Sequence, residues 1–184
     1  MRLVFCDTET GGLSPETDAL LSIGLVDWAD GQILDTAEIL VDPEGLVCGA
    51  KAMEINRIDL DVHLAYSVPR SEAARLVRDW CGPRGRVVLA GHNVGFDIGF
   101  LKRLFAPGMW SFSFSHHQID MMQILAFLGD CGIIPPGIGK LDQAIAYFGI
   151  QVPTGKRHTA LGDALATAEV YTHLLDAVRR KVAA

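Results

Sequence analysis

Two carboxylates stand two positions apart near the start of the chain, in the segment Asp7-Thr8-Glu9. The apolar residues 3–6 precede them and predict a buried strand. Because strand side chains alternate between faces, Asp7 and Glu9 project to the same side and lie close together. Two like charges at the end of a buried element repel each other unless a cation or a proton compensates them. This pair alone is read either as part of a divalent metal site or as a solvated strand end.

A third carboxylate, Asp97, lies in the segment 91–101, which leads from a predicted strand into a helix. Asn93 is the expected N-cap of that helix. Asp97 shares one helix face with Leu101 and Leu104, so it heads a stripe that faces the core. An acid near a helix N-terminus is also stabilised by the helix dipole, by under about 1 kcal/mol, so this residue alone specifies no chemistry.

A fourth carboxylate, Asp163, heads a similar stripe, with Ala166 and Val170 at positions +3 and +7. His158 precedes Asp163 by five residues, and that spacing cannot place both side chains on one face of a regular helix. We therefore expect His158 in the loop that enters the helix. A single histidine is more often structural or simply exposed than catalytic.

Together these segments resemble, in order along the chain, the three motifs of the DnaQ-like 3′→5′ exonucleases of the DEDD superfamily. That family includes polymerase proofreading subunits, oligoribonuclease and ribonuclease T. The first motif, Asp-x-Glu with Thr-Gly following, is matched by Asp7, Glu9, Thr10 and Gly11. The second, an acid after His-Asn-x-x-Phe, is matched by His92, Asn93, Phe96 and Asp97. The third, a His five residues before an Asp, is matched by His158 and Asp163, as in the histidine (DEDDh) subgroup.

The resemblance implies a ribonuclease-H-like fold and hydrolysis at a 3′ end that releases nucleoside 5′-monophosphates. Four carboxylates without a Cys ligand suit Mg²⁺ or Mn²⁺, and two such ions can clamp an in-line phosphoryl displacement. We assign the two cations to Asp7, Glu9, Asp97 and Asp163. His158 is expected to act as the general base, because an imidazole with a reference pKa of about 6.5 accepts a proton near neutral pH.

The resemblance also supplies candidate substrate-binding residues. Thr10, Gly11 and Leu13 match family positions near the 3′-terminal nucleotide, and Asn93 and Phe96 belong to the second motif. Two basic residues, Lys156 and Arg157, adjoin His158. They are either phosphate-attracting groups or solvated loop charges.

The remaining pattern predicts an α/β fold with a mixed sheet whose first three strands form a meander, flanked by helices. Residues 19–28 and 32–41 read as a hairpin around Asp30-Gly31, and the first strand reads as central. A strand is expected at 86–90, and helices at 71–80 (capped by Ser71), 94–105, 121–128, 141–148 and 161–180. Trp110, Phe112 and Phe114 alternate with serines, which predicts a strand with one buried face.

Composition sets broad limits on the class of protein. The chain has 184 residues, 49% of them hydrophobic, so we expect one domain over residues 1–184. Its four cysteines form no Cys-x-x-Cys pair and no apolar run is long enough to span a membrane, which favours the cytoplasm. A net charge of −6 argues against nonspecific coating of nucleic acid but is compatible with an enzyme that acts on an end.

Several alternatives remain open from the sequence. The favoured substrate is the 3′ end of single-stranded DNA, and an RNA 3′ end, as for oligoribonuclease or ribonuclease T, is the alternative. Oligoribonucleases usually carry Glu-Met-Thr-Gly-Leu, whereas this chain has an additional glycine, Gly12, before Leu13. An endonuclease of the same broad fold and a noncatalytic module that recruits a partner are other classes. A polymerase is a candidate partner, and the oligomeric state is open.

Overall fold

The computed structural model describes residues 2–153, 155 and 157–183. In the described residues, five strands form one sheet in the order β3-β2-β1-β4-β5. The strands are β1 (Arg2–Thr10), β2 (Leu20–Ala29), β3 (Gln32–Leu40), β4 (Val87–Gly91) and β5 (Phe114–Asp120). The first three strands pair antiparallel, and β4 and β5 continue the sheet in parallel with β1. This confirms the predicted mixed sheet, its opening meander and the central place of the first strand.

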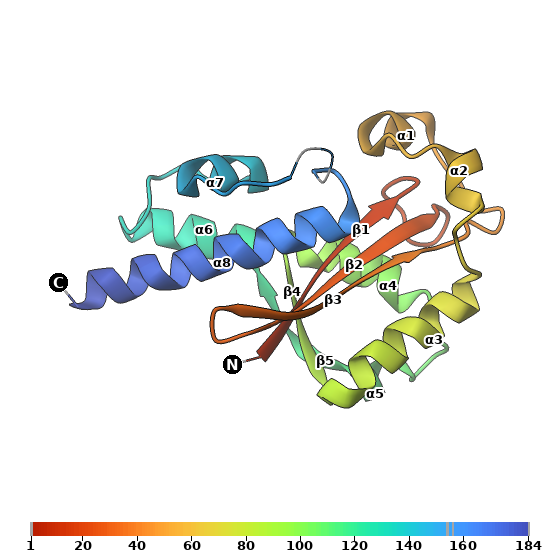
Figure 1. Ribbon diagram of the computed structural model, residues 1–184, viewed down its shortest axis with the longest axis horizontal. Coiled ribbons are helices and arrows are strands. Elements are labelled where there is room, and N and C mark those ends of the chain that lie inside the picture. The colour runs from red at the N-terminus through yellow and green to blue at the C-terminus, as the bar shows by residue number, and fades with distance from the viewer. Residues whose placement is uncertain (1, 154, 156, 184) are drawn as a thin grey trace.

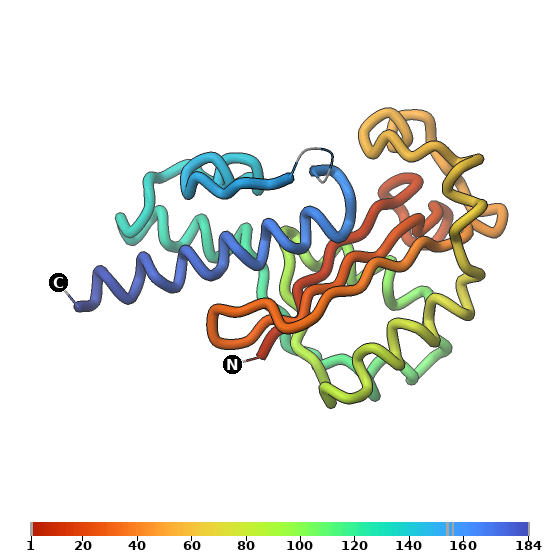
Figure 2. Tube along the Cα trace, in the orientation of Figure 1, coloured from red at the N-terminus to blue at the C-terminus, as the bar shows by residue number. Residues whose placement is uncertain are grey.

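Helices cover both faces of the sheet (Figure 1). One layer contains α6 (Met121–Asp130), α7 (Leu141–Phe148) and the long α8 (Ala160–Ala183). The other contains α3 (Arg70–Cys81), α4 (Val94–Lys102) and α5 (Trp110–Ser113), with the short 3₁₀ helix η1 (Gly82–Arg84) after α3. Two small helices, α1 (Ala50–Asn56) and α2 (Leu60–Leu64), lie beyond the C-terminal end of β1 (Figure 2).

Side chains of β1 alternate between two separate hydrophobic cores, as the sequence predicts. Leu3 and Phe5 belong to the core beneath α8, where Phe5 contacts the Tyr171 ring at a centroid distance of 5.5 Å. Val4 and Cys6 belong to the other core, which includes residues of α3 and α4. By this alternation Asp7 and Glu9 continue the α8 face of the strand, whereas Thr8 continues the α4 face.

The predicted strand over Trp110, Phe112 and Phe114 is wrong. Trp110–Ser113 form the helical turn α5, and β5 begins only at Phe114. The Trp110 and Phe114 rings stack with centroids 4.0 Å apart, while Phe112 is 74% exposed. Over so few residues an alternating pattern does not exclude a helical turn, since residues four apart also meet on a helix.

Helix ends were predicted less well than helix positions. The helix α3 begins at Arg70 after Pro69, so Ser71 lies inside the first turn and is not the cap. Asn93 does stand at the N-cap position of α4, but its side chain makes no capping hydrogen bond. That helix ends at Lys102 instead of 105. The helix α1 was not predicted because its one buried residue, Asn56, gives no apolar periodicity.

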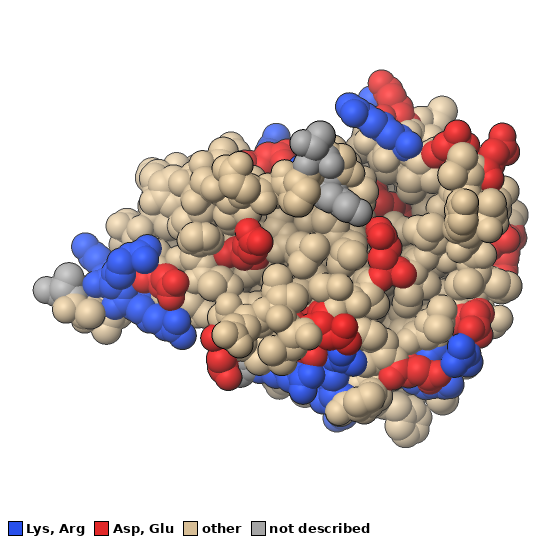
Figure 3. Space-filling model, viewed as in Figure 1, with Lys and Arg blue, Asp and Glu red and all other residues tan. Residues whose placement is uncertain are grey.

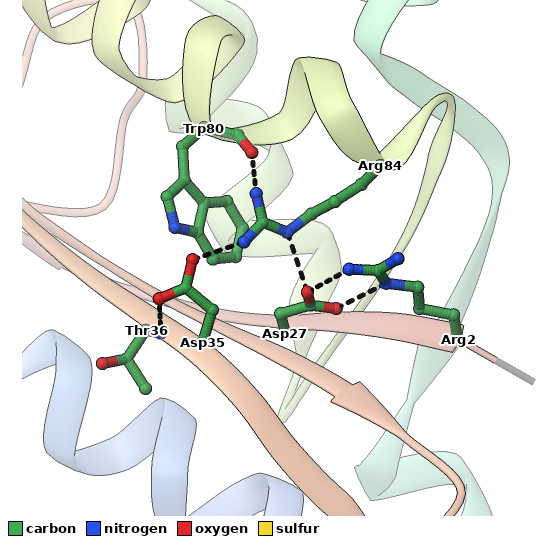
Figure 4. Close-up of polar contacts among 6 residues, drawn as sticks. All are labelled: Arg2, Asp27, Asp35, Thr36, Trp80 and Arg84. Atoms are coloured by element: carbon green, nitrogen blue, oxygen red, sulfur yellow. Dashed lines mark hydrogen bonds and ion pairs between the residues drawn. The ribbon is translucent and has the colours of Figure 1, made fainter.

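An ion-pair network centred on Asp27 ties the N-terminal end of β1 to its neighbours (Figure 4). The Asp27 side chain is fully buried and accepts from Arg2 Nε at 2.8 Å and from Arg84 Nε at 2.9 Å. Arg84 also pairs with Asp35 and lies over the Trp80 ring, with its Cζ 3.7 Å from the centroid. The hydrogen bond from Arg2 is the main cause that lowers the pKa of Asp27. This network fixes the end of the sheet that lies away from the carboxylates.

The surface agrees with the charge argument made from the sequence. On the face shown in Figure 3, Lys and Arg side chains form separate clusters, one of them at the C-terminal end of α8, and no continuous basic stripe crosses this face. All four cysteines are free. Within the described residues, no helix combines the length and the apolar character needed to cross a membrane.

Candidate active site

The four predicted carboxylates come from three elements that meet at the C-terminal end of β1. Asp7 and Glu9 lie on β1 itself, Asp97 lies in the first turns of α4, and Asp163 lies in the first turn of α8. Thr8 joins two of these elements, because its Oγ1 donates a 2.7 Å hydrogen bond to Asp97 Oδ1 inside the protein. Thr8 was not among the predicted site residues, although its place on the α4 face of β1 follows from the strand alternation.

Gly24 allows α8 to approach the sheet beside Asp7. It is the register partner of Asp7 on β2. A Cβ atom at this position would lie 2.3 Å from the backbone C and O of Ala160 and 2.4 Å from the Leu161 nitrogen. The first turn of α8 therefore rests directly on the β2 backbone, and this contact places Asp163 near β1. One sequence gives no signal that distinguishes Gly24 from any other strand glycine.

His158 lies in the turn that enters α8, as expected. Thr159 caps the start of α8, because its Oγ1 accepts a 3.1 Å hydrogen bond from the Gly162 nitrogen. The backbone nitrogen of His158 donates to Asp163 Oδ1 at 3.2 Å. His158 has a φ of +60°, an unusual conformation for a residue with a side chain. Its side chain is exposed. The turn thus holds the backbone of His158 beside Asp163 and leaves its side chain open to solvent, on a strained backbone of the kind that is concentrated at functional sites.

Burial and mutual repulsion shift the acids toward their protonated forms. Burial raises the pKa of Asp7 well above its ordinary value, and Asp97 and Glu9 raise it further. Burial, followed by the charge of Asp97, raises the pKa of Glu9 to about 7. Burial likewise raises the pKa of Asp97 to about 7, although the Thr8 hydrogen bond opposes this. Asp97 is buried and Asp7 and Glu9 are half-buried, so these carboxylates lack sufficient positive charge when no ligand is bound.

Arg157 supplies part of the missing positive charge. Its guanidinium forms an ion pair with Asp163 and another, at 2.5 Å, with Asp142 at the start of α7. In the part of the chain that the structure describes, no three His, Cys, Asp or Glu side chains are grouped so as to hold a metal ion. Two of the four carboxylates have other partners, since Asp97 accepts from Thr8 and Asp163 accepts from Arg157. Lys156, the other basic residue singled out in the sequence, lies outside the described residues.

A cleft of about 470 Å³ opens beside Glu9, within the size range of small-ligand sites. Four of the five predicted substrate-binding residues line it, namely Thr10, Gly11, Leu13 and Phe96. Residues of α1 form the opposite wall, among them Lys51, Ala52, Ile55 and Asn56. Cavities of about 550 and 590 Å³ lie elsewhere on the molecule, and none of the predicted site residues lines them.

The fifth predicted residue, Asn93, does not line this cleft. It adopts a left-handed φ of +64°, and its backbone nitrogen donates to Asp120 Oδ1 at 3.1 Å. The same Asp120 oxygen caps α6 by accepting from the Met122 nitrogen at 3.0 Å. Asp120 therefore links the second motif to the end of β5. Asp120 was not among the predicted site residues, although an acid at the end of a strand beside a helical pattern is a signal in the sequence.

A mixed sheet with carboxylates at the end of its central strand is the architecture of the ribonuclease-H-like nucleases. Escherichia coli Exonuclease I, solved in complex with a dT13 oligonucleotide, has this fold, with a TM-score of 0.81 and 18% identity over 98% of this chain and 42% of that one. The RNase_T family model, described as Exonuclease, matches residues 4–171. The chain belongs to the RNase_T exonuclease family.

Two curated relatives are DNA polymerase III proteins by name. The chain is 29% identical over 185 residues to the DNA polymerase III subunit epsilon-like protein of Rhodobacter capsulatus. This match covers 98% of this chain and 25% of that protein. It is 25% identical over 177 residues to the DNA polymerase III PolC-type protein of Thermotoga petrophila. This match covers 96% of this chain and 12% of that protein. The chain therefore spans only a small part of the length of these relatives.

Proposed function

We propose that this nuclease is a 3′→5′ exonuclease of the histidine subgroup that hydrolyses single-stranded DNA and releases nucleoside 5′-monophosphates. Asp7, Glu9, Asp97 and Asp163 would hold two divalent cations, Mg²⁺ or Mn²⁺. His158 acts as the general base. The observation that carries the proposal is that β1, α4 and α8, the elements that carry these four acids, meet at the end of the central strand, where Glu9 lines an open cleft.

The donor set fits divalent cations of this kind. The acids are hard oxygen donors, and the raised pKa values of Asp7, Glu9 and Asp97 reflect a shortage of positive charge. When bound, the ions supply a water of lowered pKa and a counter-charge for the departing 3′ oxygen. Arg157 pairs with one carboxylate oxygen of Asp163 and so competes with a cation for this acid.

The protein's own residues place the reacting groups. His158 is exposed beside Asp163, so its imidazole can accept a proton from the attacking water. The cleft receives the terminal nucleotide. Leu13, which is 85% exposed at its edge, offers an apolar surface to the terminal base. Thr10 and Gly11 bring backbone groups to the terminal sugar.

The relatives support DNA as the substrate. Exonuclease I was solved with a DNA oligonucleotide, and both curated relatives are DNA polymerase III proteins. A polymerase partner is proposed on the same ground. An exoribonuclease is the alternative, and the assay below distinguishes it from a DNA exonuclease.

The test uses 5′-end-labelled single-stranded DNA and RNA of the same sequence, incubated with Mg²⁺ or Mn²⁺ and resolved at single-nucleotide resolution. Asp7→Asn, which keeps the size of the side chain, is the inactive control. A descending ladder from wild-type protein alone supports the proposal, and the faster substrate decides between DNA and RNA. Labelled mononucleotide as the first product would indicate 5′→3′ polarity and contradict the proposal. Internal fragments at the earliest times would indicate an endonuclease instead.

A further inference from the structure

Arg157 lies between two helix N-termini at the edge of the acidic cluster. Its Nη1 pairs with Asp163 Oδ1, while its Nε and Nη2 donate to Asp142 Oδ1 at 3.2 and 2.5 Å. The Arg157 and Asp163 side chains are only 23% and 14% exposed, whereas the Asp142 side chain is 70% exposed. The guanidinium therefore connects an inner carboxylate of the site to an outer one at its rim.

The charge of Arg157 also reaches the acids on β1. It lowers the pKa of both Asp7 and Glu9, against the larger effects of burial and of the neighbouring acids. An arginine stays protonated at any pH at which a protein is folded, so this compensation cannot be removed by titration. Arg157 thus supplies positive charge to Asp163, Asp7 and Glu9, the acids to which the proposed function assigns the cations.

We propose that Arg157 substitutes for a divalent cation at Asp163, and that metal binding transfers its Nη1 from Asp163 to a phosphate of the substrate while Asp142 retains the rest of the guanidinium. This inference rests on the proposed function, because it takes Asp163 as a metal ligand. It makes Arg157 a phosphate-binding residue and Asp142 the residue that positions it.

The geometry of the guanidinium suits two partners at once. A guanidinium is planar and presents its five N–H groups in a rigid fork, so that different edges bind different acceptors. The Nε and Nη2 edge is occupied by Asp142, and Nη1 is the group shared with Asp163. When a cation takes Asp163, Nη1 becomes available to a phosphate oxygen without loss of the Asp142 pair. Arg157 therefore competes with metal before loading and attracts the substrate after it.

The proposal predicts opposite effects of two substitutions on metal affinity, measured by titration calorimetry of the full chain with Mn²⁺ in the absence of nucleic acid. Arg157→Ala is expected to tighten Mn²⁺ binding by about tenfold, because the competing, partly buried ion pair is lost. Asp142→Asn is expected to weaken it by about threefold, because Arg157 then turns fully to Asp163. Arg157→Lys should lie between wild type and Arg157→Ala.

The double variant separates this competition from a general charge effect. In the Arg157→Ala background, Asp142→Asn should no longer change Mn²⁺ affinity, because no guanidinium remains to be redirected. Arg179→Ala is the matched control. It removes an exposed Arg–Asp pair on α8, the helix that also carries Asp163. In that pair Arg179 contacts Asp176 at 3.1 Å, and its loss should leave Mn²⁺ binding unchanged.

A second readout tests the phosphate contact. At saturating Mn²⁺, Arg157→Ala should raise the KM for single-stranded DNA by about tenfold, and Arg157→Lys should restore much of the loss. Equal or weaker Mn²⁺ binding by Arg157→Ala, or a DNA KM that does not change, would overturn the inference. Failure of the wild-type protein to bind Mn²⁺ at all would instead overturn the proposed function, so the two failures are distinguishable.

Discussion

Replacing Gly24 by alanine tests whether the contact of α8 with β2 sets the position of Asp163. The new Cβ would lie 2.3 Å from the backbone C and O of Ala160, whereas ordinary contact begins at 3.4 Å. Both neighbours are backbone atoms and cannot rotate away. The first turn of α8 must therefore shift by about 1 Å, a displacement that can cost about 100-fold in rate when it moves a catalytic group.

The effect on stability should be smaller than the effect on rate. Overpacking costs about 1 to 3 kcal/mol. The lower conformational freedom of alanine in the unfolded chain returns up to about 1 kcal/mol of this. We expect a free energy of unfolding reduced by about 1 to 2 kcal/mol and a turnover reduced by about 100-fold, with the folded fraction still high under assay conditions.

The assay measures kcat on 5′-labelled single-stranded DNA at saturating Mn²⁺, alongside urea unfolding of the same preparation. Gly82→Ala is the matched control, because a Cβ at Gly82 would meet no atom within 4 Å. It should retain wild-type turnover. A Gly24→Ala protein that keeps turnover within twofold of wild type would refute the claim that this contact positions Asp163.

Three further predictions concern other parts of the molecule. Asp27→Ala should lower the free energy of unfolding by about 1.5 to 3 kcal/mol in denaturant titrations, because the nearly buried Arg84 keeps only Asp35 as a charged partner, whereas Arg2 is half exposed. Turnover per folded molecule should not change, and a loss below 1 kcal/mol would contradict this account. Without metal, stability should fall as pH rises from about 4.5 to 7, because the raised pKa of Glu9, about 7, lets the folded state hold a proton that the unfolded chain has released. Unfolding measured at several pH values checks this. Mn²⁺ added at pH 8 should restore the stability that the metal-free protein loses between pH 4.5 and 7. A metal-free stability that rises over that interval would argue against this account. Asn56→Ala should raise the KM for DNA by about tenfold with little change in kcat, because the buried Asn56 Nδ2 holds α1 to the Thr10 carbonyl at 3.2 Å. Steady-state kinetics measures this, and an unchanged KM would show that α1 is held by other contacts.

The sequence predicts those features that depend on local pattern. Strand alternation places Asp7 beside Glu9, and the five-residue spacing of the third motif places His158 in a turn before α8. The alternating pattern also places Thr8 on the opposite face of β1, where it meets Asp97. These results need only the periodicity of a strand or a helix.

Features that depend on contacts across the fold could not be predicted. The contact of Gly24 with Ala160 joins residues far apart in the chain, and a glycine in a strand does not indicate which backbone approaches it. The pairing of Arg157 with Asp142 depends on how α7 meets the start of α8. A six-residue alternation at Trp110 was too short to separate strand from helix.

The contact between Gly24 and Ala160 also bears on when this enzyme becomes active during synthesis. Asp163 reaches its place only when the first turn of α8 docks on β2, and β1 also pairs with β4, as in the pairing of Val4 with Leu89. Such pairings join distant parts of the chain and form late in folding. A nascent chain that already displays Asp7 and Glu9 therefore lacks the complete site until most of the sequence has been translated, which delays nuclease activity until the fold is complete.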